Sequence, residues 1–370
     1  MNTLPNTSLS RRHFVGRLAL GAAALTLPGA SWAQVDRSKK LGIALCGLGN
    51  YSRGQLGPAL KVTEHCYLAG VITGSKEKGQ QWAKDYGFSE KNIYDYTSMQ
   101  RMADNRDIDI VYVVTPNSLH APHTIAAAKA GKHVICEKPM AMTAAECDTM
   151  IAACQKANVR LSIGYRLHFE PHTQELKRLA VEKDFGTFMK MSGGNGFRMA
   201  RKVWRAEHKL SGGGPLMDMG VYSVQAACMA AGNARCIAVT AKEHPKTRPE
   251  IFEDVEEGLD YTLEFSNGAK AELVTTYADR IGKFRAKGDK GWIELEPAHS
   301  YQGIKGRTHK GPLEITPIAN QQAAQMDDFA LCVRDKRESI VGAAMGRRDM
   351  VIIDAIYEAM RSGRRVAVNV

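Results

Sequence analysis

The first residues with a chemical signature are two glycines that follow a short apolar run. Gly47-Leu48-Gly49-Asn50-Tyr51-Ser52 comes directly after residues 41–46 and stands before a helical stretch. The first glycine permits a tight turn, and the second lets the backbone approach a pyrophosphate at a helix N-terminus. Ser52 replaces the third glycine of G-x-G-x-x-G, so the match is partial, and a purely structural turn is the alternative. The pattern predicts that Gly47, Gly49, Asn50 and Tyr51 bind a dinucleotide.

The end of the next apolar run indicates which dinucleotide this is. NAD-specific sites usually place Asp or Glu here to bond the ribose hydroxyls. Gly74 stands at this position, and Ser75 and Lys76 follow it. An acid would repel a 2′-phosphate, whereas a hydroxyl and an ammonium group bind one. We therefore expect NADP, with Ser75 and Lys76 on its 2′-phosphate; a solvated basic turn is the alternative.

Such a site needs a scaffold of alternating strands and helices, and the sequence contains one. Continuous apolar runs are typical of strands that are covered on both faces. The strand-like runs are residues 41–46, 67–72, 110–115, 133–136 and 161–165, and the helical stretches between them are residues 76–86, 122–130 and 144–157. This alternation predicts a parallel, doubly wound sheet of the Rossmann type.

The pattern changes after about residue 165. Strand-like runs at 188–192, 236–242, 258–265, 269–277, 282–288 and 291–295 are separated by turns such as Ser266-Asn267-Gly268, and a helix at 348–361 follows. Hairpin-like strands favour an open antiparallel or mixed sheet. The expected fold class is therefore α/β: an N-terminal Rossmann domain at 34–160 and a C-terminal α/β domain at 161–370 with a large, open, mostly antiparallel sheet.

Residues 1–33 are typical of an export leader rather than of a fold. Ser10-Arg11-Arg12-His13-Phe14-Val15 is a twin-arginine pattern, and Ser31-Trp32-Ala33 resembles a cleavage site. The apolar stretch between them has about ten residues, half of what a membrane-spanning helix needs. We expect export of the folded protein to the periplasm by the twin-arginine route; an ordinary Sec signal is the alternative.

Composition excludes several other classes of protein. The 370 residues are 44% hydrophobic and 24% charged, as in ordinary globular proteins. The net charge is +11, and removal of the leader with its three arginines leaves +8, without a basic cluster of the kind that nucleic acid needs. We expect no nucleic-acid partner and no membrane span. None of the eight cysteines has C-x-x-C spacing, and no disulfide is expected.

Two pairs of histidines have spacings that could resemble metal ligands. They are His120/His123 and His168/His172. Neither pair has a third ligand with supporting spacing. We therefore expect no metal site.

Two further motifs carry a resemblance to a known family. Cys136-Glu137-Lys138-Pro139 ends one expected strand, and Thr115-Pro116-Asn117-Ser118-Leu119-His120 ends the strand before it. Together they resemble the Gfo/Idh/MocA oxidoreductase family, and within it the glucose–fructose oxidoreductase branch. The resemblance covers essentially the whole mature chain. It implies a Rossmann domain followed by an α/β domain with a large open sheet, in agreement with the pattern above.

The resemblance also assigns site residues. It implies a catalytic group of Lys138, Asp218 and Tyr222. It implies that the substrate contacts these three residues together with Tyr165 and Arg166. It also implies that further residues bind the cofactor: Pro116, Asn117, His120, Glu137, Lys138, Trp204 and Arg205. For Tyr165, Arg166, Trp204 and Arg205 a structural role is an equal alternative.

The chemistry of the catalytic group can also be argued from the residue types. Oxidation of a sugar hydroxyl needs a proton acceptor at oxygen and a hydride acceptor. A free tyrosine has a pKa near 10, so it is a poor base unless a nearby cation favours its phenolate. Lys138 can supply that charge and orient the substrate oxygen. Asp218 lies four residues before Tyr222, one helical turn away, where it can orient the sugar and tune Lys138.

The expected function is an NADP-dependent sugar oxidoreductase that oxidises an aldose at C1 to a lactone. In the glucose–fructose type, tightly held NADPH then reduces a second sugar to an alditol. One rival is a sugar or dihydrodiol dehydrogenase with exchangeable cofactor, and another is a non-catalytic sugar- or nucleotide-binding protein on the same fold. About seven residues precede the first strand, without the long arm of the glucose–fructose enzyme. The identity of the acceptor sugar and the retention of the cofactor therefore stay open. The state of the homo-oligomer also stays open, with a dimer or a tetramer through the C-terminal sheet as the alternatives.

The leader generates a prediction about export. Replacement of Arg11 and Arg12 by Lys should leave the precursor in the cytoplasm, because the twin-arginine route depends on the arginine pair. Fractionation of cells that express the wild-type or the double-lysine protein measures this. Unchanged export of the double-lysine variant would exclude the twin-arginine route.

Overall fold

The computed structural model describes residues 40–369, and the expected leader at residues 1–33 lies outside this range. A six-stranded sheet has the order β3-β2-β1-β4-β5-β6, and all of its neighbours are parallel. Its strands are β1 (Leu41–Cys46), β2 (Cys66–Ile72), β3 (Ile93–Tyr94), β4 (Ile110–Val113), β5 (His133–Cys136) and β6 (Leu161–Ile163). This is the strand order of dinucleotide-binding Rossmann domains, and it confirms the expected parallel sheet.

Helices connect these strands, and two of them, α2 and α4, begin at side-chain caps. They are α1 (Gly57–Leu60), α2 (Lys76–Tyr86), α3 (His120–Lys129) and α4 (Ala144–Lys156). The Ser75 side chain accepts from the Lys78 amide at the start of α2, and Gly87 ends the helix with a φ of 73°. Thr143 caps α4 in the same way. Caps of this kind satisfy amide groups that have no partner within the helix.

The second sheet has nine strands and is mostly antiparallel, as expected. Its order is β14-β13-β12-β11-β7-β10-β9-β8-β15, and β7 with β10 is its parallel pair among the described residues. The strands are β7 (Lys190–Gly196), β8 (Cys236–Glu243), β9 (Gly258–Phe265), β10 (Lys270–Thr276), β11 (Ile281–Lys287), β12 (Trp292–Leu295), β13 (Gly306–Thr308), β14 (Gly311–Pro312) and β15 (Val366–Ala367).

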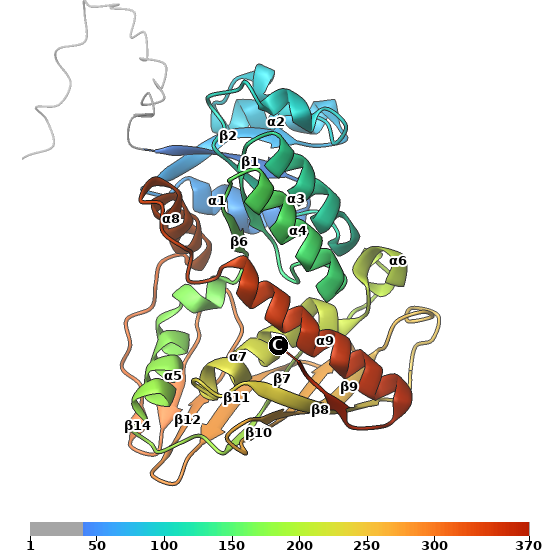
Figure 1. Ribbon diagram of the computed structural model, residues 1–370, viewed down its shortest axis with the longest axis vertical. Helices are drawn as coiled ribbons and strands as arrows, with labels where there is room; N and C mark the ends of the chain where they lie inside the picture. Colours follow the sequence, from blue (N-terminus) through green and yellow to red (C-terminus); the bar gives the residue numbers. More distant parts are fainter. Residues whose placement is uncertain (1–39, 370) are drawn as a thin grey trace, which may run out of the picture. The chain divides into compact units, whose positions relative to one another are not determined.

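Helices of the second half of the chain lie over this sheet or beside the Rossmann domain (Figure 1). They include α5 (Pro171–Glu182), α6 (His208–Ser211), α7 (Val221–Ala230), α8 (Gln321–Arg334) and α9 (Ala343–Ser362). Figure 1 shows α7 and α9 lying over the strands, while α8 lies apart from them beside the Rossmann domain. Within residues 40–369, no helix combines the length and apolarity needed to cross a membrane.

Short helical turns complete the chain. Two are π-helical, Ser52–Leu56 and Leu216–Gly220. The others are 3₁₀ turns at Glu90–Asn92, Met99–Met102, Asn117–Leu119, Arg166–Phe169 and Trp204–Ala206.

Two segments cross the expected domain boundary at residue 160. Strand β6, residues 161–163, pairs with β5 and completes the parallel sheet. Helix α8 packs Met326, Phe329 and Ala330 into the core that lies beneath β1 and β2. A helix more than 150 residues further along the chain therefore covers part of the Rossmann sheet. Burial of apolar surface does not depend on the order of elements in the chain.

Candidate active site

A cavity of about 1320 Å³ lies where the Rossmann strands end and loops of the C-terminal domain face them. The strand order reverses between β1 and β4, and ligands of open parallel sheets bind outside the strand ends at such a point. Most of the expected site residues line this cavity: Gly47, Gly49, Asn50, Tyr51, Ser75, Pro116, Asn117, His120, Glu137, Lys138, Arg166, Trp204, Arg205, Asp218 and Tyr222. Lys76 and Tyr165 do not. Tyr165 is buried in the main hydrophobic core.

The glycine turn has the geometry of a phosphate cradle. Gly47 has a φ of 106°, and a Cβ there would lie 2.9 Å from the Val114 carbonyl oxygen, so glycine is required. A Cβ on Gly49 would meet nothing within 4 Å, so the backbone here borders open space. Ser52 donates its hydroxyl to the Gly47 carbonyl at 2.6 Å, which explains a serine where the motif has its third glycine. The turn fits a pyrophosphate against the helical N-terminus.

The end of β2 presents a different lysine from the one expected. Thr73, Gly74, Ser75 and Lys78 line the cavity. The Ser75 hydroxyl caps α2 by accepting from the Lys78 amide at 3.2 Å, and it donates to Glu77 at 2.9 Å. Ser75 and Lys78 are therefore the hydroxyl and the ammonium group that line this end of the cavity.

Lys138 lies at the end of β5 and reaches across to the C-terminal domain. Its Nζ donates to the main-chain oxygen of Asp218 at 2.5 Å and lies 3.5 Å from the Asp218 Oδ1. The same ammonium group lies 4.7 Å from the centre of the Tyr222 ring. Lys138 thus contacts both of the other expected catalytic residues, Asp218 and Tyr222.

The Asp218 carboxylate is shared by two cations and a phenol. Arg205 Nε lies 3.1 Å from Oδ1, and Tyr277 donates its hydroxyl to Oδ2 at 3.0 Å. Burial by itself raises the pKa of Asp218, but Arg205, Lys138 and the Tyr277 hydroxyl together hold it below the ordinary value. Asp218 is therefore an anion at neutral pH, suited to orient cations and sugar hydroxyls rather than to take up a proton.

Tyr222 lies between two cations. Its ring is 8% exposed, with Lys138 Nζ near it and Arg166 Cζ 5.1 Å from its centre. His299 stacks against it at 6.1 Å between ring centres, and burial lowers the pKa of His299 to about 3, so this imidazole is neutral. Negative charge that develops on the Tyr222 oxygen would be stabilised by both neighbouring cations.

Glu137, the acid that precedes Lys138 in the motif of residues 136–139, stabilises the position of Lys138. Its Oε1 accepts from the Tyr112 hydroxyl at 2.7 Å, and its Oε2 accepts from the Lys138 amide at 3.1 Å. Burial raises the pKa of Glu137, and Lys138, Tyr112 and Arg166 oppose that shift. A Cβ on Gly164 would lie 2.6 Å from Oε1, so the carboxylate packs against the backbone that follows β6.

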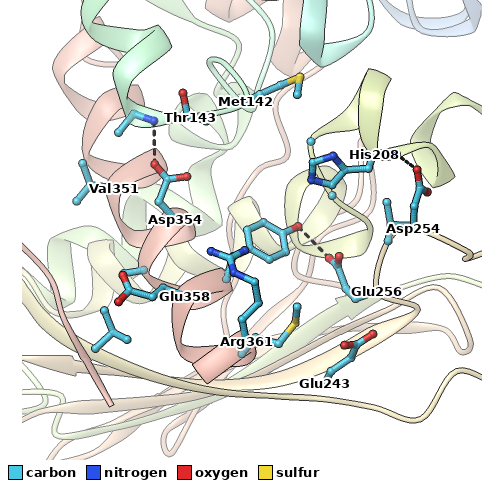
Figure 2. Close-up of a pocket in the computed structure, with 18 of the residues that line it drawn as sticks. Met142, Thr143, His208, Glu243, Asp254, Glu256, Val351, Asp354, Glu358 and Arg361 are labelled. Atoms are coloured by element: carbon cyan, nitrogen blue, oxygen red, sulfur yellow. Dashed lines mark hydrogen bonds between the residues drawn. The ribbon is translucent and has the colours of Figure 1, made fainter. Parts of the chain in front are cut away.

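A buried acid braces the helical segment that carries Asp218 and Tyr222. Glu256 accepts hydrogen bonds from the Gly214 amide at 2.9 Å, the Leu216 amide at 3.1 Å and the Tyr357 hydroxyl at 3.0 Å. It borders a second cavity, of about 750 Å³, that Figure 2 shows beside α9. Two of these bonds satisfy amides at or just before the start of the π-helical turn Leu216–Gly220, and π-helical turns occur frequently at functional sites.

Several residues of the cavity had no signal in the sequence. Tyr277 follows β10, and His299 and Tyr301 lie in the loop between β12 and β13; each is far from the motifs along the chain. Tyr301 lies 5.9 Å from Tyr51 between ring centres and 4.3 Å from Arg166 Cζ. No short-range spacing connects these residues, so pattern analysis could not find them.

Three of the four histidines that are spaced like metal ligands have polar partners within the protein. The ring nitrogens of His120 lie 2.8 Å from the Pro139 oxygen and 3.0 Å from the Thr115 oxygen, and burial lowers its pKa to about 4. His123 contacts the Thr115 hydroxyl at 3.2 Å, and His172 contacts Glu170 at 2.8 Å. His120 thus links the loops that follow β4 and β5.

The fold and the cavity define the class of protein: a two-domain oxidoreductase with a Rossmann domain for a nicotinamide dinucleotide. Two family models match the chain, "Oxidoreductase family, NAD-binding Rossmann fold" at residues 41–165 and "Oxidoreductase family, C-terminal alpha/beta domain" at residues 182–368. The chain belongs to the Gfo/Idh/MocA oxidoreductase family.

Three known proteins illustrate the similarity. The crystal structure of aldose-aldose oxidoreductase from Caulobacter crescentus, complexed with glycerol, is 42% identical with a TM-score of 0.86, over 89% of this chain and 100% of that one. D-xylose 1-dehydrogenase [NADP(+)] of Haloarcula marismortui is 27% identical over 88% of this chain and 92% of its own. D-glucoside 3-dehydrogenase of Escherichia coli is 27% identical over 89% and 98%.

The position of Lys78 generates a prediction about cofactor choice. Lys78→Ala should weaken NADP binding by about 10- to 150-fold, the worth of one charge-assisted hydrogen bond, and leave NAD binding almost unchanged. Lys76→Ala is the matched control, since it removes the same charge from the same helical turn. Titration of the apoprotein with both dinucleotides measures this. Equal weakening of NADP and NAD by Lys78→Ala would refute the assignment, and a larger effect of Lys76→Ala would transfer it to Lys76.

Proposed function

We propose that the protein oxidises an aldose at C1 to an aldonolactone, with NADP⁺ as hydride acceptor, and that the retained NADPH then reduces a second sugar to an alditol. The observation that carries this proposal is Tyr222 between Lys138 and Arg166 at the end of a dinucleotide cavity. The 42% identity to an aldose-aldose oxidoreductase, over the full length of that chain, supports an aldose as substrate. D-xylose 1-dehydrogenase [NADP(+)] supports both the C1 position and NADP.

The charges of the cavity support NADP rather than NAD. Its lining has five basic residues, Lys78, Lys138, Arg166, Arg201 and Arg205, and two acids, Glu137 and Asp218. The cavity therefore has three basic groups in excess. NADP⁺ carries about three net negative charges at neutral pH because its 2′-phosphate adds about two. The dinucleotide balances the excess, and a neutral sugar is the substrate that completes such a site.

Each residue of the site has a separate role in the proposed reaction. Bound NADP⁺ supplies the hydride acceptor. Tyr222 takes the proton of the C1 hydroxyl as the hydride leaves C1, and it returns this proton to the carbonyl oxygen of the second sugar. Lys138 orients the reacting oxygen and stabilises its negative charge. Asp218 holds Lys138 and Arg205 in place. The cycle conserves protons and electrons, so it needs no other reductant.

Export is part of the proposal. The periplasm contains no pool of free NADP, so an exported enzyme that released its cofactor would stop after one turnover. A retained cofactor and two alternating sugars avoid this limit. A second candidate function, a dehydrogenase with exchangeable NADP, is favoured by the similarity to D-xylose 1-dehydrogenase.

The absorbance of the purified protein distinguishes the two candidates. We expect the protein to carry NADP through purification, and one aldose alone should produce no more than one equivalent of reduced nicotinamide. A second sugar should then abolish the nicotinamide absorbance band and yield an alditol. Steady turnover of a single aldose that requires added NADP⁺ would favour the exchangeable dehydrogenase. Failure of all aldoses to reduce the cofactor would refute both.

The proton acceptor generates a separate prediction. Tyr222→Phe keeps the ring and removes the ionisable oxygen, so single-turnover hydride transfer from an aldose should fall by about 10²–10⁴-fold while NADP still binds. Tyr86→Phe is a matched control, since Tyr86 lies outside the cavity and packs on Trp82. Lys138→Met should cause a similar loss, and the double variant should lose much less than the product of the two. Near-normal transfer in Tyr222→Phe would exclude Tyr222 as the base.

A further inference from the structure

Arg166 is a buried cation that forms no ion pair with a carboxylate among residues 40–369. The residue is 2% exposed and lies in the 3₁₀ turn that follows β6. Its guanidinium donates to the Ser300 oxygen at 3.0 Å, to the His299 oxygen at 2.6 Å and to the side-chain oxygen of Gln321. All three acceptors are neutral. Among residues 40–369 no carboxylate lies within ion-pair distance of it, and its Nε has no hydrogen-bond partner.

Lys138, the other cation beside Tyr222, differs in this respect. Its ammonium group is bound to the main-chain oxygen of Asp218 and lies 3.5 Å from that residue's carboxylate. Much of its charge is therefore compensated before any substrate enters. Burial of a charge without an ion-pair partner is costly. A neighbouring group that becomes negative during the reaction would therefore be stabilised by Arg166.

Three tyrosines surround the Arg166 guanidinium. Its Cζ lies 4.3 Å from the ring centre of Tyr301 and 5.1 Å from that of Tyr222, and the Tyr51 ring lies tilted against Tyr301. Burial raises the pKa of Tyr51, and Glu137 and Tyr222 raise it further. Burial and Tyr222 also raise the pKa of Tyr301. Both therefore keep their protons, although Arg166 opposes the shift, and Tyr222 is the ring that lies between two cations.

The other titratable groups that face Tyr222 and Arg166 leave this balance intact. His299, on the loop after β12, is neutral because burial and Arg166 lower its pKa to about 3. Glu137, at the end of β5, is bound by the Tyr112 hydroxyl and the Lys138 amide. Asp218, on the segment before Tyr222, is bound by Lys138, Arg205 and Tyr277. No facing acid in residues 40–369 forms an ion pair with Arg166, although Glu137 interacts with it electrostatically.

We propose that Arg166 is the positioning residue that lets Tyr222 act as the base: its guanidinium lies against the Tyr222 ring and stabilises the negative charge that develops on the phenol oxygen, while Lys138 is committed to Asp218 and to the substrate oxygen. The proposal rests on the proposed function in that it gives Tyr222 the role of proton acceptor. Arg166 transfers no proton: the proton moves from the sugar hydroxyl to Tyr222 and back to the second sugar. The guanidinium stays charged throughout.

A substitution at Gln321 can neutralise the charge of Arg166 while the Arg166 side chain stays in place. Gln321 is the first residue of α8, is 3% exposed and does not line the cavity. Gln321→Glu has nearly the same shape and places a carboxylate on the Arg166 guanidinium. The N-terminus of a helix also favours an acid. The Gln321 amide donates to the Ser300 oxygen at 3.2 Å, and the substitution loses this bond. Gln321→Ala is the control for lost contacts: it loses this bond and the bond from Arg166 to the Gln321 side chain, without adding charge.

The test is an ultraviolet titration of tyrosinate in the cofactor-free protein. The difference between each protein and its Tyr222→Phe counterpart isolates the signal of Tyr222. In Gln321→Glu this signal should appear at least about one pH unit higher than in the wild type, the usual effect of a neighbouring charge. Gln321→Ala should remain near the wild type. An unchanged titration in Gln321→Glu, or an equal shift in Gln321→Ala, would overturn the proposal.

Kinetics supply an independent reading. Single-turnover hydride transfer in Gln321→Glu should fall about 10-fold or more at neutral pH and recover at higher pH, whereas a merely structural defect would lower the rate at every pH. If Gln321→Glu does not fold, the pair Arg166→Lys, which keeps the charge, and Arg166→Met, which removes it, gives the same comparison. A wild-type protein that oxidises no aldose would refute the proposed function, and the titration would still decide the role of Arg166.

Discussion

The contact between Lys138 and Asp218 holds the site together across the two domains. Lys138 comes from the end of a Rossmann strand, and Asp218 comes from a helical turn that packs on the second sheet. Arg205 and Tyr277 complete the surroundings of the Asp218 carboxylate. An unpaired carboxylate would be unstable in this buried position. The residues that stabilise this one also fix the distance between the dinucleotide cavity and Tyr222.

The helical segment that bears Asp218 and Tyr222 is itself held from the far side. Glu256 receives two backbone amides and the Tyr357 hydroxyl, and burial raises the pKa of Glu256 while these bonds oppose the shift. Gly214 is required there, because a Cβ would lie 2.2 Å from the Glu256 carbonyl oxygen. A wide π-helical turn follows, and it sets Asp218 and Tyr222 at angles that a regular helix would not give. The active site is thus braced by a network that touches neither cofactor nor substrate.

The cavity separates its charges by function. Ser75 and Lys78 lie at the end of β2, and Lys138, Arg166 and Arg205 lie around Asp218 and Tyr222. Histidines near the reacting position are kept neutral by burial, with pKa values of about 4 for His120 and about 3 for His299. Phenol and carboxylate groups therefore respond to lysine and arginine rather than to imidazolium, which is consistent with a tyrosine as proton acceptor.

The sequence by itself determined the local features of this protein. Apolar runs located β1, β5 and β9 at their observed bounds, Ser75 and Gly87 delimit α2, and Gly47 and Gly49 marked the cofactor turn, since each depends on neighbours within a few residues. Tertiary structure decided the rest. Lys78 rather than Lys76 lines the cavity, because the two residues lie at different positions around the first turn of α2. Tyr165 is buried in the core instead of lining the cavity. The tertiary structure also brought Tyr277, His299, Tyr301 and Gln321 to the site, because these loop and helix residues meet only when two sheets pack, and no spacing along the chain records that contact.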